Sequence, residues 1–86
     1  MTTTQTTVPS TVLVIRKCMT SVVHRQLASK EEVLNMLLDI RSAAVEEQLT
    51  KVVERIDTTS VAWPKSELVS SSEVVDYMLD LDLFIS

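Results

Sequence analysis

The chain contains no glycine, and this absence constrains its fold more than any other feature. Tight two-residue hairpins, phosphate-binding loops and dinucleotide-binding motifs depend on glycine, which adopts positive φ at no steric cost and lets a ligand approach the backbone. P-loop and Rossmann chemistry are therefore excluded. A chain of 86 residues is long enough for one domain, which buries only about 60% of its unfolded surface.

Apolar residues recur every three or four positions along most of the chain, which predicts an all-α bundle of three or four helices. The first helix is expected over about 11–27, capped by Ser10 or Thr11. Its apolar face consists of Val12, Ile15, Met19, Val23 and Leu27. A strand over the β-branched residues 11–15 is the alternative. Residues 1–9 are expected to be a flexible leader, and 10–86 a single helical domain.

A second helix is predicted to begin at the capping box formed by Ser29 and Glu32. One apolar stripe then keeps its phase as far as residue 57: Leu34, Leu38, Val45, Leu49, Val52 and Ile56. A second stripe widens the apolar face in the first half: Val33, Leu37, Ile40 and Ala44. Two interpretations remain open. Either one helix runs over 30–57 as a rod of about 42 Å, or it is broken near Ser42, which then caps a new helix.

The last helix is predicted over about 71–83. Pro64 disfavours helical geometry at Trp63 and is suited to open a short turn at 65–68. Ser70 and Glu73 form a second capping box, and Val69 and Val74 occupy the positions of a hydrophobic staple. The apolar face of this helix is Val74, Met78, Leu81 and Ile85, and its acidic face is Glu73, Asp76 and Asp80.

The net charge of −4 is unevenly distributed. Residues 1–30 contain Arg16, Lys17, Arg25 and Lys30 but no acid, whereas acids predominate in the rest of the chain. We expect the basic first helix to pack among acidic neighbours, and nucleic acid to be an unlikely partner. The alternative is a DNA-associated transcriptional regulator that binds phosphate through its amino-terminal third and docks a protein on its acidic C-terminal helix.

Residues that carry catalytic or metal chemistry are sparse. Cys18 is the only cysteine, so no intrachain disulfide forms, which favours a reducing compartment, cytoplasmic or nuclear. His24 is the only histidine, and it lies on a different helical face from Cys18. Asp80 and Asp82 lack the glycine and glutamate of an EF-hand loop. The apolar runs are too short to cross a membrane. We therefore expect no enzyme, no cofactor, no metal site and no membrane association.

These exclusions leave a protein–protein interaction module, a small regulatory, adaptor or assembly subunit that forms a homodimer through the 30–57 stripe. A rod longer than its neighbouring helices leaves apolar surface for a second chain to cover. Trp63 is either a lid over the core or an interface anchor. The predicted interface residues are Leu38, Arg41, Val45, Leu49, Val52, Ile56, Trp63, Met78 and Leu81. A viral or mobile-element inhibitor of a host protein is a further alternative.

Overall fold

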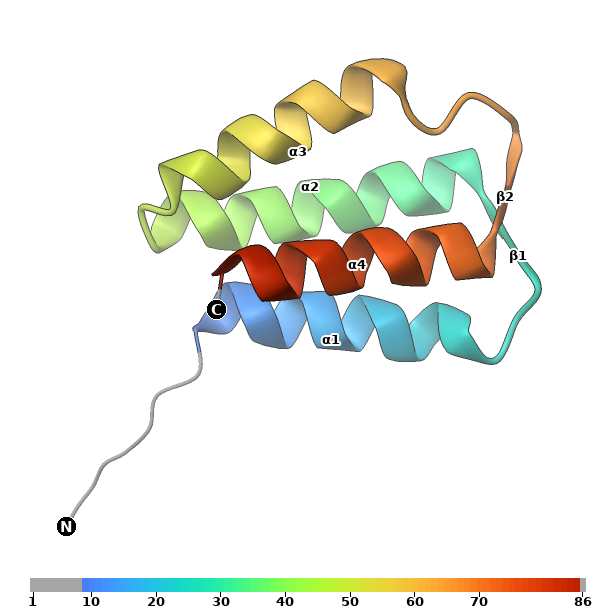
Figure 1. Ribbon diagram of the computed structural model, residues 1–86, viewed down its shortest axis with the longest axis horizontal. Helices are drawn as coiled ribbons and strands as arrows, with labels where there is room; N and C mark the ends of the chain where they lie inside the picture. The colour runs from blue at the N-terminus through green and yellow to red at the C-terminus, as the bar shows by residue number, and fades with distance from the viewer. Residues whose placement is uncertain (1–8, 86) are drawn as a thin grey trace, which may run out of the picture.

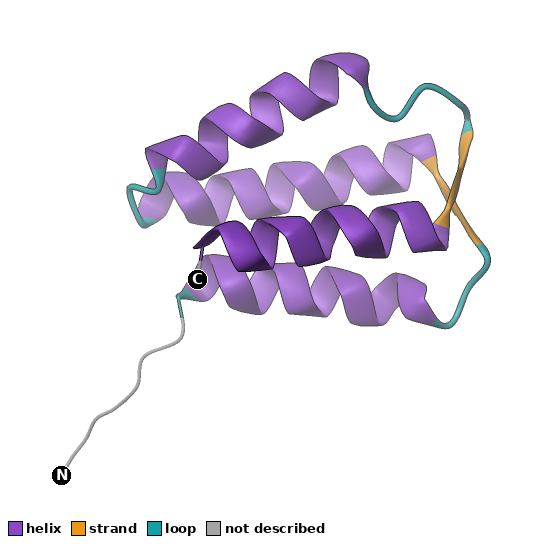
Figure 2. Cartoon of the chain, viewed as in Figure 1, coloured by secondary structure: helices purple, strands orange, loops and turns teal. Residues whose placement is uncertain are grey.

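The computed structural model describes residues 9–85 and confirms the all-α bundle, with four helices and two short strands over this range (Figures 1 and 2). The elements in chain order are α1 (Ser10–Val23), β1 (Leu27–Ser29), α2 (Lys30–Glu46), α3 (Thr50–Ala62), β2 (Leu68–Ser70) and α4 (Ser71–Ile85). The predicted leader lies outside the described residues except for Pro9. Within residues 9–85, no helix combines the length and the hydropathy that a membrane crossing requires.

The first helix begins near the predicted residue but ends four residues early, at Val23 rather than at 27. Val23 and Leu27, which extend the predicted stripe, are both more than half exposed. Val12 and Ile15 of the predicted face are buried, as expected, and the rest of the buried face consists of Thr11, Cys18 and Val22. Residues 11–15 are helical, so the strand alternative for them is wrong. The two strands lie at 27–29 and 68–70, where the sequence indicated a helix end and a turn.

The predicted 30–57 rod is not continuous. The chain turns at 47–49, between α2 and α3. The interpretation with a broken helix is therefore correct, but the break begins five residues after Ser42. Gln48 adopts φ 60°, a left-handed conformation that glycine would normally supply at the end of a helix. The Leu49 N–H donates to the Ala44 carbonyl at 2.8 Å. This bond closes the turn and folds α3 back along α2.

The helix termini agree with the sequence only in part. At α2, Ser29 accepts a hydrogen bond from the Glu32 N–H at 3.1 Å, as predicted, but the Glu32 carboxylate pairs with Arg25 rather than reaching back. At α4, the Ser70 hydroxyl instead bonds the Ser72 hydroxyl. α3 ends at Ala62, and Trp63 is extended, as the following proline requires.

The amino end of α1 is capped by a residue from elsewhere in the chain. No side-chain cap is supplied locally, so the expectation for Ser10 or Thr11 is wrong. The Glu47 carboxylate accepts hydrogen bonds from the Ser10 N–H at 2.8 Å and from the Thr11 N–H at 2.7 Å. The Thr11 hydroxyl also donates to it. A carboxylate at the positive end of a helix dipole is favourable, so Glu47 ties the end of α2 to the start of α1.

The two halves of the structure repeat each other. Each half is a helix–strand–helix unit, and residues 41 positions apart, such as Leu27 and Leu68, occupy equivalent places. The strands pair antiparallel about Ala28 and Val69, which are themselves equivalent. The backbone hydrogen bonds that flank this ribbon are equivalent too, because Lys30 donates to Glu67 and Ser71 donates to Gln26. The units are thus related by a local two-fold axis through the ribbon.

The amino-acid sequence shows the same repeat: the segment from β1 into α2 is similar to the segment from β2 into α4. Six positions are identical at this 41-residue separation: Leu27 and Leu68, Ser29 and Ser70, Glu32 and Glu73, Val33 and Val74, Leu38 and Leu79, and Asp39 and Asp80. The core follows the same equivalence. Buried pairs include Ile15 and Ile56, Ala28 and Val69, Leu37 and Met78, and Ile40 and Leu81.

The two units differ in how closely their helices pack. α1 lies against both α2 and α4, and α2 lies against α3. In the second unit, α3 and α4 make much less contact along their lengths than α1 and α2 do in the first, and Figures 1 and 2 show α3 rising away from α4 toward the ribbon end. The fold therefore has a closed unit and an open one.

Candidate interaction surfaces

Eight of the nine predicted interface residues fall into two groups in the structure. Val52, Ile56, Met78 and Leu81 are buried in the intramolecular core, each at most 3% exposed, and no partner reaches them in this fold. Four others lie on one surface formed by α2 and α3: Leu38, Arg41, Val45 and Leu49. The core stripe of α2 is the second predicted one, which runs from Val33 to Ala44. The α2 part of the first stripe faces outward, with Leu38 and Val45 exposed, whereas its α3 part, Val52 and Ile56, is buried.

We call this surface the α2–α3 face and define it by Leu34, Leu38, Arg41, Val45, Leu49, Val53, Asp57 and Ser60. Two shallow hollows follow one another along it, one around Leu38 and the other around Val45. These two side chains are 61% and 52% exposed, respectively. The face is therefore an apolar strip along two neighbouring helices, with charged groups near its middle.

An ion pair crosses the α2–α3 face. The Arg41 guanidinium donates from Nε to Asp57 Oδ1 at 2.7 Å and from its Nη2 to Asp57 Oδ2 at 3.3 Å. The hydrogen bond from Arg41 lowers the pKa of Asp57 and raises that of Arg41.

A second ion pair at the equivalent positions also joins the two units, with its charges exchanged. Asp82 occupies the position equivalent to Arg41, and Arg16 the one equivalent to Asp57; their charged atoms are 3.7 Å apart between α1 and α4. The α2–α3 and α1–α4 faces therefore carry an ion pair at equivalent positions, but the basic and acidic residues are exchanged between them.

Trp63, the ninth predicted residue, is half-buried beside the open unit. Its ring lies 5.4 Å from that of Tyr77 at an interplanar angle of 41°, and its indole N–H donates to Glu73 Oε1 at 3.3 Å. A tryptophan packed on the core in this way agrees with a lid and presents only part of its ring to a partner.

A groove separates α3 from α4 in the open unit. It is lined by Lys51, Glu54, Arg55, Thr58, Thr59, Tyr77, Asp80 and Phe84. A hollow between α1 and α2 is lined by seven residues equivalent to these, among them Val14, Met36 and Ala43. Arg55, Tyr77 and Phe84 take the places of those three smaller side chains. We attribute the separation of α3 from α4 to this added bulk.

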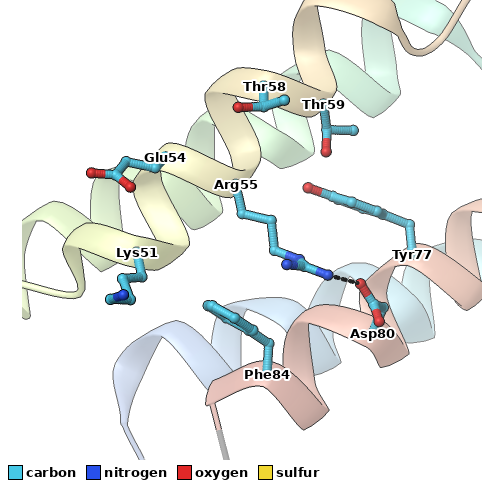
Figure 3. A pocket seen from close by; sticks show the side chains of 8 residues that line it. All are labelled: Lys51, Glu54, Arg55, Thr58, Thr59, Tyr77, Asp80 and Phe84. Atoms are coloured by element: carbon cyan, nitrogen blue, oxygen red, sulfur yellow. Dashed lines mark hydrogen bonds and ion pairs between the residues drawn. The ribbon is translucent and has the colours of Figure 1, made fainter.

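Arg55 reaches across the groove from α3 to α4 (Figure 3). Its Nη2 lies 3.0 Å from Asp80 Oδ2, and its guanidinium carbon lies 4.6 Å from the centroid of the Phe84 ring. Figure 3 also shows Tyr77 directed toward Thr59 on the opposite wall. Burial raises the pKa of the Tyr77 hydroxyl, and its interaction with Thr59 lowers it, with a net rise. The groove therefore holds a cation between the Asp80 carboxylate and the Phe84 ring.

The remaining chemistry-bearing residues are placed apart from these surfaces or within the bundle. The Cys18 thiol is buried, and burial followed by the Asp39 charge raises its pKa to about 11. His24 is exposed where α1 ends. Over residues 9–85, no three His, Cys, Asp or Glu side chains come together in an arrangement able to hold a metal ion.

Acids neutralise two of the bases in the amino-terminal third. Arg16 is paired with Asp82, and the Arg25 Nη2 lies 2.6 Å from Glu32 Oε2. The first helix is thus a basic element packed beside the acidic α4, the arrangement expected from the charge distribution.

Sequence reasoning missed the α3–α4 groove, because Arg55 and Phe84 lie on separate helices without a local motif. Aligning the chain on itself at a separation of 41 residues would have paired them with Val14 and Ala43 and marked the difference in size. Comparisons with protein-family models, with curated proteins and with solved structures found no match for this chain.

Proposed function

We propose that this protein is a non-enzymatic interaction module that binds a second copy of itself through the α2–α3 face. The observation that carries the proposal is the exposure of Leu38 and Val45 on one strip, with Leu34, Leu49 and Val53 half-buried beside them. Apolar side chains gathered along one face mark interaction sites more often than single exposed ones do.

The charges on the face favour a particular pairing. When two copies meet with α2 of one lying over α3 of the other, each Arg41 approaches the Asp57 of the second copy. Placing α2 on α2 would bring the two Arg41 side chains together. Like charges across an interface are unfavourable, so the crossed arrangement is the proposed one.

The expected affinity is modest. Two helices side by side, about 25 Å long and 20 Å wide together, give a footprint on the order of 500 Å² per copy. Stable complexes bury about 800 Å² per partner, and weaker transient ones bury less. We therefore propose a dimer that dissociates in the micromolar range.

A binding role also accords with the state of the one nucleophilic thiol. With a pKa of about 11, Cys18 is protonated at neutral pH, and the thiol is a far poorer nucleophile than the thiolate. A single buried cysteine further supports a reducing compartment as its location.

Sedimentation velocity from micromolar to submillimolar protein tests the proposal. The wild type is expected to shift from monomer to dimer, and the Leu38→Asp and Val45→Asp double variant to remain monomeric. The control is Leu13→Asp with Val23→Asp, which places the same two charges at equally exposed positions on α1. Circular dichroism establishes that both variants keep their helices. A wild type that stays monomeric, or a dimer lost only in the control, would refute the proposal.

A further inference from the structure

The groove between α3 and α4 is the strongest candidate for a second binding site, on a different part of the surface from the α2–α3 face. Its lining differs from that of the equivalent hollow in the closed unit, because Arg55, Tyr77 and Phe84 stand where the closed unit has smaller residues. Equivalent positions in a repeated fold normally keep similar side chains so that both halves pack alike. Here, both halves have a hollow at equivalent places, but only the one in the open unit is lined by an arginine and two aromatic rings.

The guanidinium of Arg55 occupies the place in the groove that a cationic group of a ligand would take. It contacts the Asp80 carboxylate at 3.0 Å and lies over the Phe84 ring at 4.6 Å. A carboxylate next to an aromatic face is a favourable environment for arginine in particular, which stacks on the ring while donating hydrogen bonds at its edge.

The internal contact is weakly held. Arg55 and Asp80 have side chains that are 42% and 55% exposed, and exposed ion pairs contribute little to stability. Arg55 can therefore swing into solvent and leave the carboxylate and ring to another cation. Since the contact is intramolecular, a competing arginine must be supported by further contacts along α4.

α4 provides those contacts. Its residues include four acids and no base, with Asp76 and Asp80 on its exposed side. Leu79, Leu83 and Phe84 are exposed on the same helix. A complementary ligand presents basic groups to Asp76 and Asp80 and an apolar group to Leu83, at the spacing of a helix face.

We infer that the α3–α4 groove binds a basic amphipathic helix of a partner protein. One arginine of the partner takes the place of the Arg55 guanidinium at Asp80 and Phe84. Leucines of the partner helix, one turn away from that arginine, pack on Leu83, and its other basic residues face Asp76. Nucleic acid and anionic membranes are disfavoured here, because the surface of α4 is itself acidic.

A titration monitored by Trp63 fluorescence tests this inference. Trp63 is the only tryptophan and packs against Tyr77 on the groove wall. The probe is a synthetic amidated helical peptide built of leucine, alanine and arginine, with one leucine face and one arginine face. The comparison peptide has glutamate in place of every arginine. The arginine peptide is expected to bind and to bind less tightly as salt increases; the glutamate peptide is expected not to bind.

Three single variants locate the site. Asp80→Asn and Phe84→Ala are each expected to weaken binding of the arginine peptide by about tenfold. Arg55→Ala is expected to strengthen it several-fold, because the internal competitor is removed. Asp39→Asn, at the equivalent position of the closed unit, is the matched control and is expected to leave the affinity unchanged.

Several outcomes would overturn the inference. Equal binding of both peptides would indicate non-specific apolar association, and an unchanged or lower affinity in Arg55→Ala would mean that Arg55 does not occupy the ligand position. Binding lost in Asp39→Asn but kept in Asp80→Asn would place the site in the closed unit. The titration is done at low protein concentration and in the Leu38→Asp and Val45→Asp background as well, so that it does not depend on self-association.

Discussion

The Glu47 carboxylate accepts a hydrogen bond from the Thr11 N–H, with its Oε1 2.7 Å from that nitrogen. Thr11 is fully buried and lies 36 residues away in the chain. The contact therefore couples the turn that ends α2 to the start of α1, and it stabilises two helix termini at once.

Replacing Glu47 by glutamine should lower the melting temperature at neutral pH by about 5 °C, because the charged cap of α1 is lost. Hydrogen bonds from Thr11 and Ser10 lower the pKa of Glu47 in the folded state. This carboxylate thus contributes stability above its unfolded pKa, and the contribution is lost as pH falls through the folded pKa.

Thermal unfolding between about pH 7 and pH 2 checks this prediction. The difference between wild type and Glu47→Gln should shrink on acidification and vanish when Glu47 is protonated in both states. Glu46→Gln, one position earlier and exposed, is the control. A difference that is constant with pH would show that the cap does not act through its charge.

Replacing valine by alanine should cost more unfolding free energy in the core than on the outer face. Val74 is fully buried in α4, whereas Val45 is half exposed in α2. Val74→Ala should reduce the free energy of unfolding by about 2 kcal/mol through lost burial and the cavity left behind. Val45→Ala should change it by less than about 0.5 kcal/mol. Urea unfolding at low protein concentration measures both, and equal losses would contradict the assignment of faces.

Gln48 should be a site where substitution stabilises the protein. Its φ of 60° is unfavourable for a residue with a Cβ atom and not for glycine. We expect Gln48→Gly to raise the free energy of unfolding by about 0.5–1 kcal/mol. Gln48→Val should lower it, because β-branching makes positive φ more costly. Urea denaturation of the two variants tests the sign of each change, and a destabilised glycine variant would refute the prediction.

Cys18 should react slowly with alkylating reagents. At pH 8, raising a thiol pKa from 9.0 to about 11 reduces the thiolate fraction about a hundredfold relative to the unfolded chain. Iodoacetamide labelling in buffer and in urea, followed by mass spectrometry, measures the ratio. Similar rates in both solvents would show that the thiol is accessible and ionised in the native state.

The same shift predicts a loss of stability in alkali. Because the folded pKa is the higher one, the neutral thiol stabilises the fold fully below about pH 9, and this contribution is lost as pH rises toward 11. The wild type should therefore lose more stability than Cys18→Ala across this window. Comparing the two variants cancels the titration of lysines, and an identical pH dependence would contradict the assigned shift.

Periodicity along the chain determined that the protein is helical, and it placed α4 and its buried face at Val74, Met78 and Leu81 correctly. It did not determine which of two stripes on α2 faces the core. Leu38 and Leu37 are adjacent, and both continue an apolar row, but only Leu37 is buried. Local spacing says which residues share a face; the neighbouring helices decide which face is covered.

The turn at 47–49 and the two strands escaped prediction for a related reason. Gln48 is not a residue that signals a helix end, and the apolar phase of Val45, Leu49 and Val52 continues across the turn. The strands form because Ala28 pairs with Val69 across the local two-fold axis. These two segments are far apart in the sequence. The 41-residue repeat was the one sequence signal that related those segments.

By itself, the amino-acid sequence determined the helical class, the capping of α2 by Ser29 and the extended geometry at Trp63, because each follows from interactions within a few residues. Only the tertiary structure decided that Glu47 caps α1, that Val52 and Ile56 are buried while Leu38 is not, and that Arg55 meets Asp80 and Phe84. Those contacts join residues from different helices, and their free energy depends on the packing of the whole bundle, which no local pattern specifies.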